Sequence, residues 1–193
     1  MSSVKMRMLL LHLCCALTDI YLSSIACPVL TLPAIAGYPL GLSLLIGIPT
    51  SVQIYVGVTM IGFTALIIVL FFENRYHVLV KGNNEMKWGR KLYYILVMTF
   101  GVTFFAPAYF EIPSQKDGIV IIQKRLPCIP SDVLKRPGFF ILAIDALIPC
   151  SLLAITVIIV MAQEAYFITK CVQHFRSNLK TSKKTLSMQK QFS

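Results

Sequence analysis

The sequence predicts an all-α integral membrane protein, a helical bundle with four transmembrane helices. Hydrophobic residues make up 56% of the chain and charged residues 13%, whereas a soluble domain carries about 25% charge. Three stretches contain no Asp, Glu, Lys or Arg: Ile20–Phe72, Leu92–Phe110 and Ala146–Gln163, of 53, 19 and 18 residues. Because a spanning helix needs about 20 apolar residues, these stretches exclude a soluble enzyme, a secreted disulfide scaffold and a disordered tail.

We expect the four spans at about 8–29, 51–72, 92–110 and 139–161, followed by a basic tail at 163–193. The segments between the spans are too short to hold a soluble module, and no internal repeat is visible. Residues 1–193 therefore form a single transmembrane domain.

The basic residues define the topology. Thirteen Lys and Arg fall in residues 1–8, 73–91 and 163–193, whereas 30–50 holds none and 111–138 holds five beside three acidic residues. The positive-inside rule places both termini and the 73–91 loop in the cytoplasm. The net charge of +10 then reflects loops near an anionic lipid bilayer, and no motif for nucleic-acid binding is present.

The prolines agree with this topology. Nine of the ten lie in the outer loops or at outer helix ends, and Pro149 lies inside the fourth expected span, where we expect a kink. A second interpretation of the N-terminus is a signal peptide cleaved after Ala26, before Cys27. Asp19 within the apolar run, and the apolar sequence that continues to Pro49, argue against cleavage.

Two carboxylates, Asp19 and Asp145, fall inside the expected spans. An ionisable group in the membrane is expensive, so each marks a candidate ion, ligand or proton site facing the bundle. The alternative is a protonated or hydrogen-bonded carboxyl that serves packing between helices. Both interpretations stay open for each residue.

One face of the second span carries polar and small residues at helical spacing. It includes Gln53, Gly57 and Thr64, and it leads to Arg75 at the end of the span. We expect this face to turn inward, with Gln53 and Gly57 as weak candidates for a ligand cavity, although ordinary helix packing explains each one equally well. Arg75 either snorkels to the lipid surface or is held by Glu73 and released to a partner.

Other chemistry is scarce. Cys27 and Cys128 both fall on the outer side, where a disulfide bridge between them is a candidate. Cys14, Cys15 and Cys150 are expected to serve packing, and Cys171 is either a free thiol or a palmitoylation site. The sequence holds no catalytic signature and no metal-ligand spacing, so we expect neither an enzyme nor a bound cofactor.

Five segments in chain order resemble one family. They read LPAIAGYPLGL at 32–42, GIPTSVQIYVG at 47–57, FENRY at 72–76, LPCIP at 126–130, and SKKT at 182–185 with QKQF at 189–192. Together they resemble the class H serpentine receptors, a family of nematode chemosensory G-protein-coupled receptors.

The resemblance implies part of a seven-helix receptor in the plasma membrane of sensory cells, with the four spans as helices two to five. A complete receptor of this kind binds a small external chemical and signals through a heterotrimeric G protein. The family pattern makes Glu73, Asn74, Arg75 and Tyr76 the G-protein switch, and Asp19 the helix-two aspartate that Thr64 faces. It also makes Pro149 the helix-five proline and Cys128 the outer-loop cysteine.

The chain also departs from the pattern of such receptors. No cysteine stands near Thr50, Val157 occupies a place that often holds tyrosine, and helices one, six and seven have no counterpart. We therefore expect a truncated receptor. The alternatives are a non-signalling four-span protein that pairs with full-length relatives in a receptor oligomer, or a small transporter or channel subunit.

Overall fold

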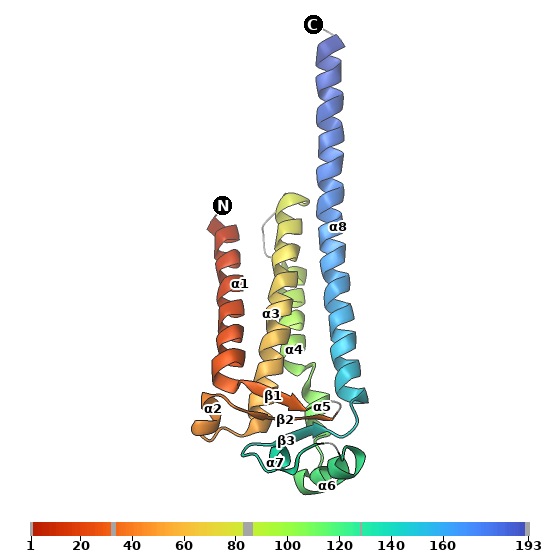
Figure 1. Ribbon diagram of the computed structural model, residues 1–193. Helices are drawn as coiled ribbons and strands as arrows, with labels where there is room; N and C mark the ends of the chain where they lie inside the picture. The colour runs from red at the N-terminus through yellow and green to blue at the C-terminus, as the bar shows by residue number, and fades with distance from the viewer. Residues whose placement is uncertain (1, 32–33, 83–86, 128, 192–193) are drawn as a thin grey trace.

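The computed structural model describes residues 2–31, 34–82, 87–127 and 129–191. Four long helices lie side by side: α1 (Ser2–Ile20), α3 (Thr50–Leu79), α4 (Trp88–Thr103) and α8 (Leu147–Gln191), as Figure 1 shows. Each contributes a segment long and apolar enough to cross a membrane. The predicted class, a membrane helical bundle with four candidate spans, is confirmed.

The two ends of the bundle differ. Both chain termini, the C-terminal end of α3 and the start of α4 gather at one end, here called the terminal end. The opposite sheet end carries the strands and the short helices (Figure 1). These helices are α2 (Leu42–Leu45), α5 (Ala106–Phe110), α6 (Gln115–Arg125) and α7 (Ser131–Leu134). The segments that sequence analysis placed on one side of the membrane therefore share one end of the bundle.

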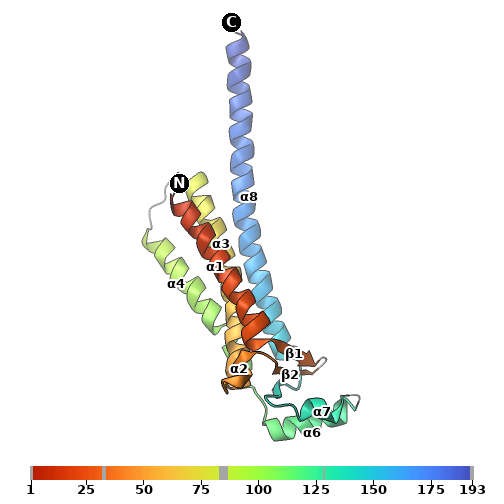
Figure 2. The same ribbon diagram turned by 60° about the vertical axis from the view of Figure 1, so that its left-hand side comes forward.

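Helix α3 is the centre of the bundle and contacts α1, α4 and α8. Its apolar side chains form a buried cluster with Val97 of α4 and Val160 of α8. Figure 2 shows α1 and α8 close to α3, while α8 continues past the other helices at the terminal end. Because α3 packs against three other helices, a displacement of α3 at one end of the bundle can be transmitted to the other end.

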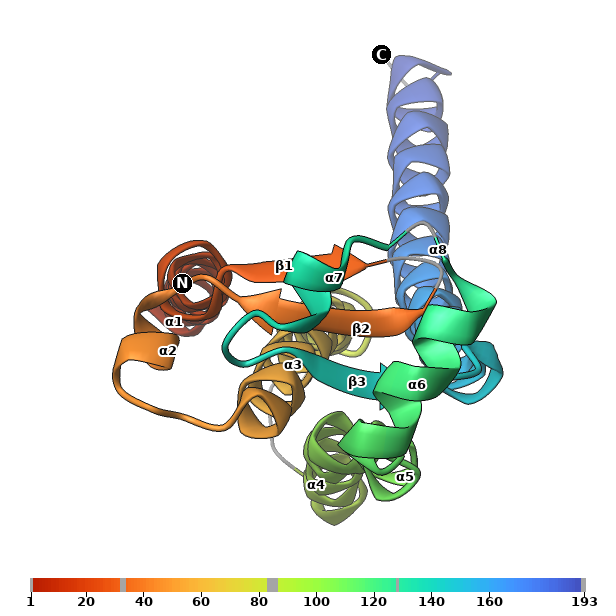
Figure 3. The same cartoon turned by 60° about the horizontal axis from the view of Figure 1, so that its bottom comes forward.

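A small antiparallel sheet closes the sheet end, and the sequence analysis did not predict it. Strands β1 (Pro28–Thr31), β2 (Ile35–Pro39) and β3 (Phe140–Ala143) lie in the order β1-β2-β3. Figure 3 shows α6 and α7 over the face turned away from the bundle. Successive side chains of a strand point to opposite faces. Accordingly, Ile141 packs with Ile122 of α6, while the adjacent Leu142 packs with Phe104 and Phe105.

The sheet shortens the first span. Helix α1 passes into a π-helix, η1 (Tyr21–Ala26), and Cys27 then takes a left-handed conformation with φ 40°. Pro28 and Val29, expected inside the span at 8–29, belong instead to β1. A non-glycine residue at positive φ is uncommon and turns the chain sharply. It ends the helix here and sends the chain across the bundle.

The third candidate span, Trp88–Phe110, ends where it was expected, but its helix is interrupted. Helix α4 ends at Thr103, four residues before Pro107 of α5, because a proline ring clashes with the carbonyl four residues earlier. The fourth helix begins at Leu147 rather than Phe139, because Phe140–Ala143 pair with β2. Pro149 therefore lies in the first turn of α8, where a missing N–H is tolerated. The expected proline kink inside this span is wrong.

Candidate functional site

A cavity of about 200 Å³ lies at the sheet end, between η1, β1, β2 and the first half of α3. Its wall is almost wholly apolar and includes Tyr21, Gln53 and Gly57. The Tyr21 hydroxyl donates a hydrogen bond to the Gln53 carbonyl oxygen at 2.9 Å. This bond ties η1 to α3 across the cavity and fixes its width.

Gln53 is buried, with 4% of its surface exposed, and both polar atoms of its side-chain amide are hydrogen-bonded. Its Nε2 donates to the Ile48 carbonyl at 2.8 Å. The Ser43 hydroxyl lies 2.6 Å from both the Gln53 Oε1 and the Ile25 carbonyl oxygen, so its single proton is shared between them. Gln53 therefore shapes the wall by joining α2, α3 and η1.

Gly57 lines the same cavity one helical turn further along α3. A Cβ at this position would lie 3.4 Å from Tyr21 Cε1 and 3.6 Å from Leu22 Cδ2, which is ordinary van der Waals contact. A larger side chain would extend into the cavity. The structure thus places both Gln53 and Gly57 in this wall, and their role in ligand binding stays a prediction.

The middle of the bundle corrects one expected contact. The Thr18 hydroxyl, and not the Asp19 carboxylate, faces Thr64, at 3.1 Å between the two Oγ1 atoms. Asp19 is exposed on the outer surface of α1. Adjacent residues on a helix point about 100° apart, so one position separates the buried threonine from the exposed aspartate. Asp19 therefore lies outside the packed interface in this structure.

Asp145 is not inside a helix. It precedes α8 and forms an exposed ion pair with Arg125, with 2.7 Å between Oδ1 and Nη1. Since exposed pairs contribute little, we expect Asp145→Asn to change the free energy of unfolding by less than about 0.5 kcal/mol. Unfolding by SDS in mixed micelles would measure this, and a large loss would restore the intramembrane interpretation.

A buried polar cluster occupies the terminal end. Arg90 of α4 donates from Nε to Glu73 Oε1 at 2.8 Å and from Nη2 to Glu73 Oε2 at 3.0 Å. The same Nη2 donates to Asn74 Oδ1 at 2.9 Å. Glu73, Asn74 and Arg90 are 2%, 1% and 6% exposed. A bidentate pair with this burial is strong and geometrically specific.

Further side chains link this Glu73–Arg90 cluster to α1, and a hydrogen bond beside the cluster ties α4 to α8. The Tyr94 hydroxyl donates to Glu73 Oε2 at 2.9 Å and accepts a hydrogen bond from Arg7 of α1. His77 Nε2 lies 3.2 Å from Glu73 Oε1. The neighbouring Tyr93 donates to Gln163 of α8 at 2.6 Å. Movement of α1, α3 or α4 at this end would disturb the cluster directly.

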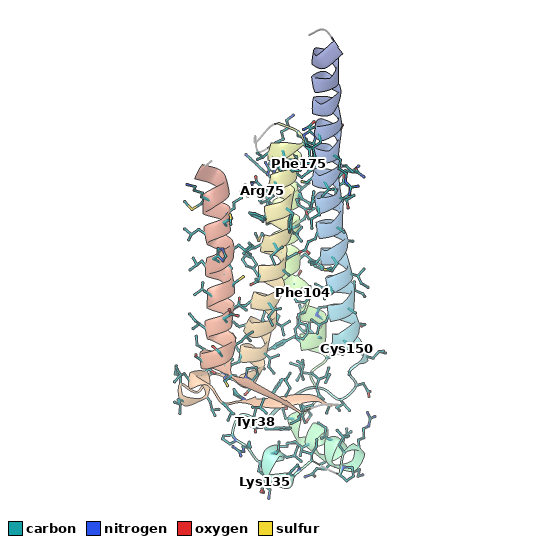
Figure 4. The ribbon with its side chains drawn as sticks, turned by 45° about the horizontal axis from the view of Figure 1, so that its top comes forward. Tyr38, Arg75, Phe104, Lys135, Cys150 and Phe175 are labelled. Atoms are coloured by element: carbon teal, nitrogen blue, oxygen red, sulfur yellow. The ribbon has the colours of Figure 1, made fainter. Side chains whose placement is uncertain are left out.

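The cluster corrects the expected pairing of Glu73 with Arg75. Glu73 is held by Arg90, and the Arg75 guanidinium instead lies over the Phe71 ring, 5.2 Å from its centroid. Among the described residues, Arg75 has no carboxylate partner. Tyr76 packs on Phe167 of α8, with 5.8 Å between ring centroids. Figure 4 shows Arg75 and Phe175 at the terminal end, far from Tyr38 and Lys135 at the sheet end.

Two further predictions concern the outer cysteines and a metal site. Cys27 is a free thiol, and Cys128 lies outside the described residues, so the Cys27–Cys128 disulfide stays a prediction. Within the described chain, no group of His, Cys, Asp and Glu could hold a metal ion.

Sequence reasoning missed Arg90, Tyr94 and Thr18. The sequence analysis counted Arg90 among the loop charges. A glutamate buried at the end of a span needs a cation as its partner. This requirement was the signal that could have identified Arg90.

The comparisons identify a family over the whole length. The model of the family described as "Serpentine type 7TM GPCR chemoreceptor Srh" matches residues 1–193. No curated protein and no solved structure matches the chain.

Proposed function

The chain belongs to the Srh family of serpentine 7TM GPCR chemoreceptors, and we propose that it binds a small apolar chemical at the sheet end and acts on a heterotrimeric G protein at the terminal end. In this proposal the sheet end faces outside and the terminal end faces the cytoplasm. Family membership supports a small-molecule ligand and a G-protein partner in general terms. The two sites and the direction of signalling are our inference.

The observation that carries the proposal is the course of α3. One continuous helix of 30 residues runs from Gln53 and Gly57, in the cavity wall, to Glu73–Tyr76 at the other end. Its middle is packed against α1, α4 and α8. A ligand that favours one position of this helix shifts the population of states at its far end.

The cavity favours apolar ligands. Its wall is lined by Leu, Ile, Val, Ala and Pro side chains beside Tyr21 and Gln53. No charged residue is among its described lining residues, so an ionised ligand would lose its hydration without compensation. We therefore propose volatile hydrocarbons, ketones or alcohols of modest size.

The terminal end supplies the switch in this proposal. Because Arg90 neutralises Glu73, Arg75 remains free to donate to an acceptor on the G protein. The terminal end also carries the basic residues of the 73–91 segment and of α8, which complement an acidic partner surface. Arg75 is the residue on which the signalling role depends.

Binding and signalling can be separated with two substitutions. We expect aliphatic ketones or alcohols to raise the melting temperature of the purified full chain in nanodiscs, and Gly57→Leu to abolish this shift by filling the cavity. Arg75→Ala should leave the shift intact but lower ligand-stimulated GTPγS binding by about tenfold or more, as for an interfacial hot-spot arginine.

The controls are matched in position. Val56→Leu enlarges an exposed residue of α3 beside Gly57, and Lys5→Ala removes an exposed charge of α1 at the terminal end. Neither should change its readout. A shift that survives Gly57→Leu contradicts the cavity, and equal signalling by Arg75→Ala and the unmodified chain contradicts the switch.

The orientation gives a separate prediction. Epitope tags on the two termini should be stained only after cells are permeabilised, because the positive-inside rule places the basic end in the cytoplasm. A tag inserted at Lys135, in the exposed segment that follows α7, should be stained on intact cells. Surface staining of either terminus contradicts the orientation.

One observation favours the alternative of pairing with full-length relatives. Much of α1 and α8 leaves leucine, isoleucine and valine side chains exposed, including Leu13, Leu17, Ile155 and Ile158. Helix packing in membranes uses such faces. If the chain alone shows the melting shift but no GTPγS response, while a co-expressed full-length relative is inhibited, pairing is the function.

A further inference from the structure

We propose that the hollow between the ends of α3 and α4 is a phosphate site that takes the headgroup of an anionic membrane lipid. The hollow is about 340 Å³ in volume and lies at the terminal end. Its wall includes Lys81 beyond α3 and Lys87, Gly89 and Arg90 at the start of α4. The inference concerns a different site from the ligand cavity and does not depend on G-protein signalling.

The first observation is an unmatched donor. Arg90 is buried, with 4% of its side chain exposed, and its Nε and Nη2 are engaged by Glu73 and Asn74. Its Nη1 is buried and has no hydrogen-bond partner among the described residues. A buried charged donor without an acceptor is costly. Because Arg90 forms part of the wall, an oxygen-rich anion in the hollow would lie beside this incompletely paired guanidinium.

The second observation is the start of α4. This helix of 16 residues begins at Trp88. Among the described residues no side chain caps its first amides, and its first turn holds no acidic residue. The N-terminus of a helix carries a partial positive charge and free N–H groups, a combination that binds phosphate. Gly89 in the first turn leaves open space, since a Cβ there would meet no atom within 4 Å.

The local charge balance also favours an anion. Glu73 is the one carboxylate among the described lining residues, and Arg90 neutralises it. The ammonium groups of Lys81 and Lys87 then remain, and Lys81 lies over the Tyr76 ring, with Nζ 5.7 Å from its centroid. His77 also lines the wall, with its Nε2 turned to Glu73.

The position of the hollow relative to the bilayer indicates a lipid headgroup as the ligand. Trp88 is 79% exposed and adjoins Lys87, and exposed tryptophans of membrane proteins concentrate at the headgroup level. Leu92, one turn further along α4, is also exposed and would face the acyl chains. A phosphate held by Lys81, Lys87 and Arg90 would thus leave its lipid tails along α4.

Trp88 is the only tryptophan of the chain, so its fluorescence reports on this site. The full chain is placed in phosphatidylcholine nanodiscs with increasing phosphatidylinositol phosphate, and separately titrated with inorganic phosphate. We expect a saturable change in Trp88 emission with the lipid. The double variant Lys81→Gln, Lys87→Gln should weaken it by about tenfold, because two direct ammonium–phosphate contacts in the hollow are lost.

The matched control is Lys91→Gln, Lys170→Gln, which removes the same charge at the same end from exposed lysines outside the hollow. It should bind within about twofold of the unmodified chain. A saturable response to inorganic phosphate, lost in the same variant, also supports the anion site and assigns it to free phosphate. Equal weakening by both double variants, or no saturable response to either probe, overturns the proposal.

Discussion

Replacing Glu73 by glutamine is expected to destabilise the bundle by about 3–5 kcal/mol, the largest single effect we predict. Glutamine keeps the shape of the side chain but removes the charge that balances Arg90, which is 6% exposed. The guanidinium would then be buried without a counter-charge, and the hydroxyl of Tyr94 would lose a charged acceptor. Unfolding by SDS in mixed micelles measures the loss.

The control for this prediction is Glu164→Gln, the same chemical change in a carboxylate of α8 that forms no ion pair among the described residues. We expect a small effect there. Replacing Glu73 and Arg90 together with Leu and Met should recover most of the stability lost in Glu73→Gln, since an apolar pair of similar volume removes both buried charges. Equal stability of the Glu73 and Glu164 variants would contradict the structural role of the pair.

The cluster also changes how the ENRY segment is understood. The family pattern assigns Glu73 and Arg75 to one switch, whereas the structure gives the carboxylate to Arg90 of the next helix. The energetic role of holding α3, α4, α1 and α8 together then belongs to Glu73 and Arg90. The signalling role we propose belongs to Arg75, whose side chain rests on Phe71. The two roles are separable by mutation.

The spans were predictable because their signal is long and local. A stretch of 53 residues without charge leaves no alternative to the membrane, and basic residues at 73–91 mark a turn of the chain. The strands were not predictable, because PVLT, IAGYP and FILA lie inside or beside apolar runs. Short apolar segments cannot be assigned to strand or helix by periodicity alone.

The site was predictable only where one helix determined it. Gln53 and Gly57 share a face of α3, and the structure places both in one cavity. Contacts between helices were less accessible. Whether Thr18 or Asp19 faces Thr64 depends on the rotation of α1, and whether Arg90 or Arg75 holds Glu73 depends on the approach of α4. Neither angle is encoded in the local pattern of a single helix.

The second large effect is expected at Gly41, which closes the sheet end. The Gly41 amide donates to the Ala26 carbonyl oxygen at 3.2 Å. The preceding amide, that of Leu40, donates to the Cys27 carbonyl oxygen at 3.0 Å. A Cβ at Gly41 would collide with the carbonyl oxygen of Ile25 and approach the Ala26 carbonyl carbon at 2.8 Å. These are backbone atoms, so no side-chain rotation relieves the clash.

We therefore expect Gly41→Ala to cost about 1–3 kcal/mol or more and to displace η1 from α2. Ile25 also accepts from Ser43, which shares its proton with Gln53, so the displacement reaches the cavity wall and should weaken the ligand-induced melting shift as well. Gly89→Ala is the control, since a Cβ there meets open space, and it should be neutral or slightly stabilising. Equal behaviour of the two variants would show that the contact between Gly41 and Ile25 does not hold the sheet end closed.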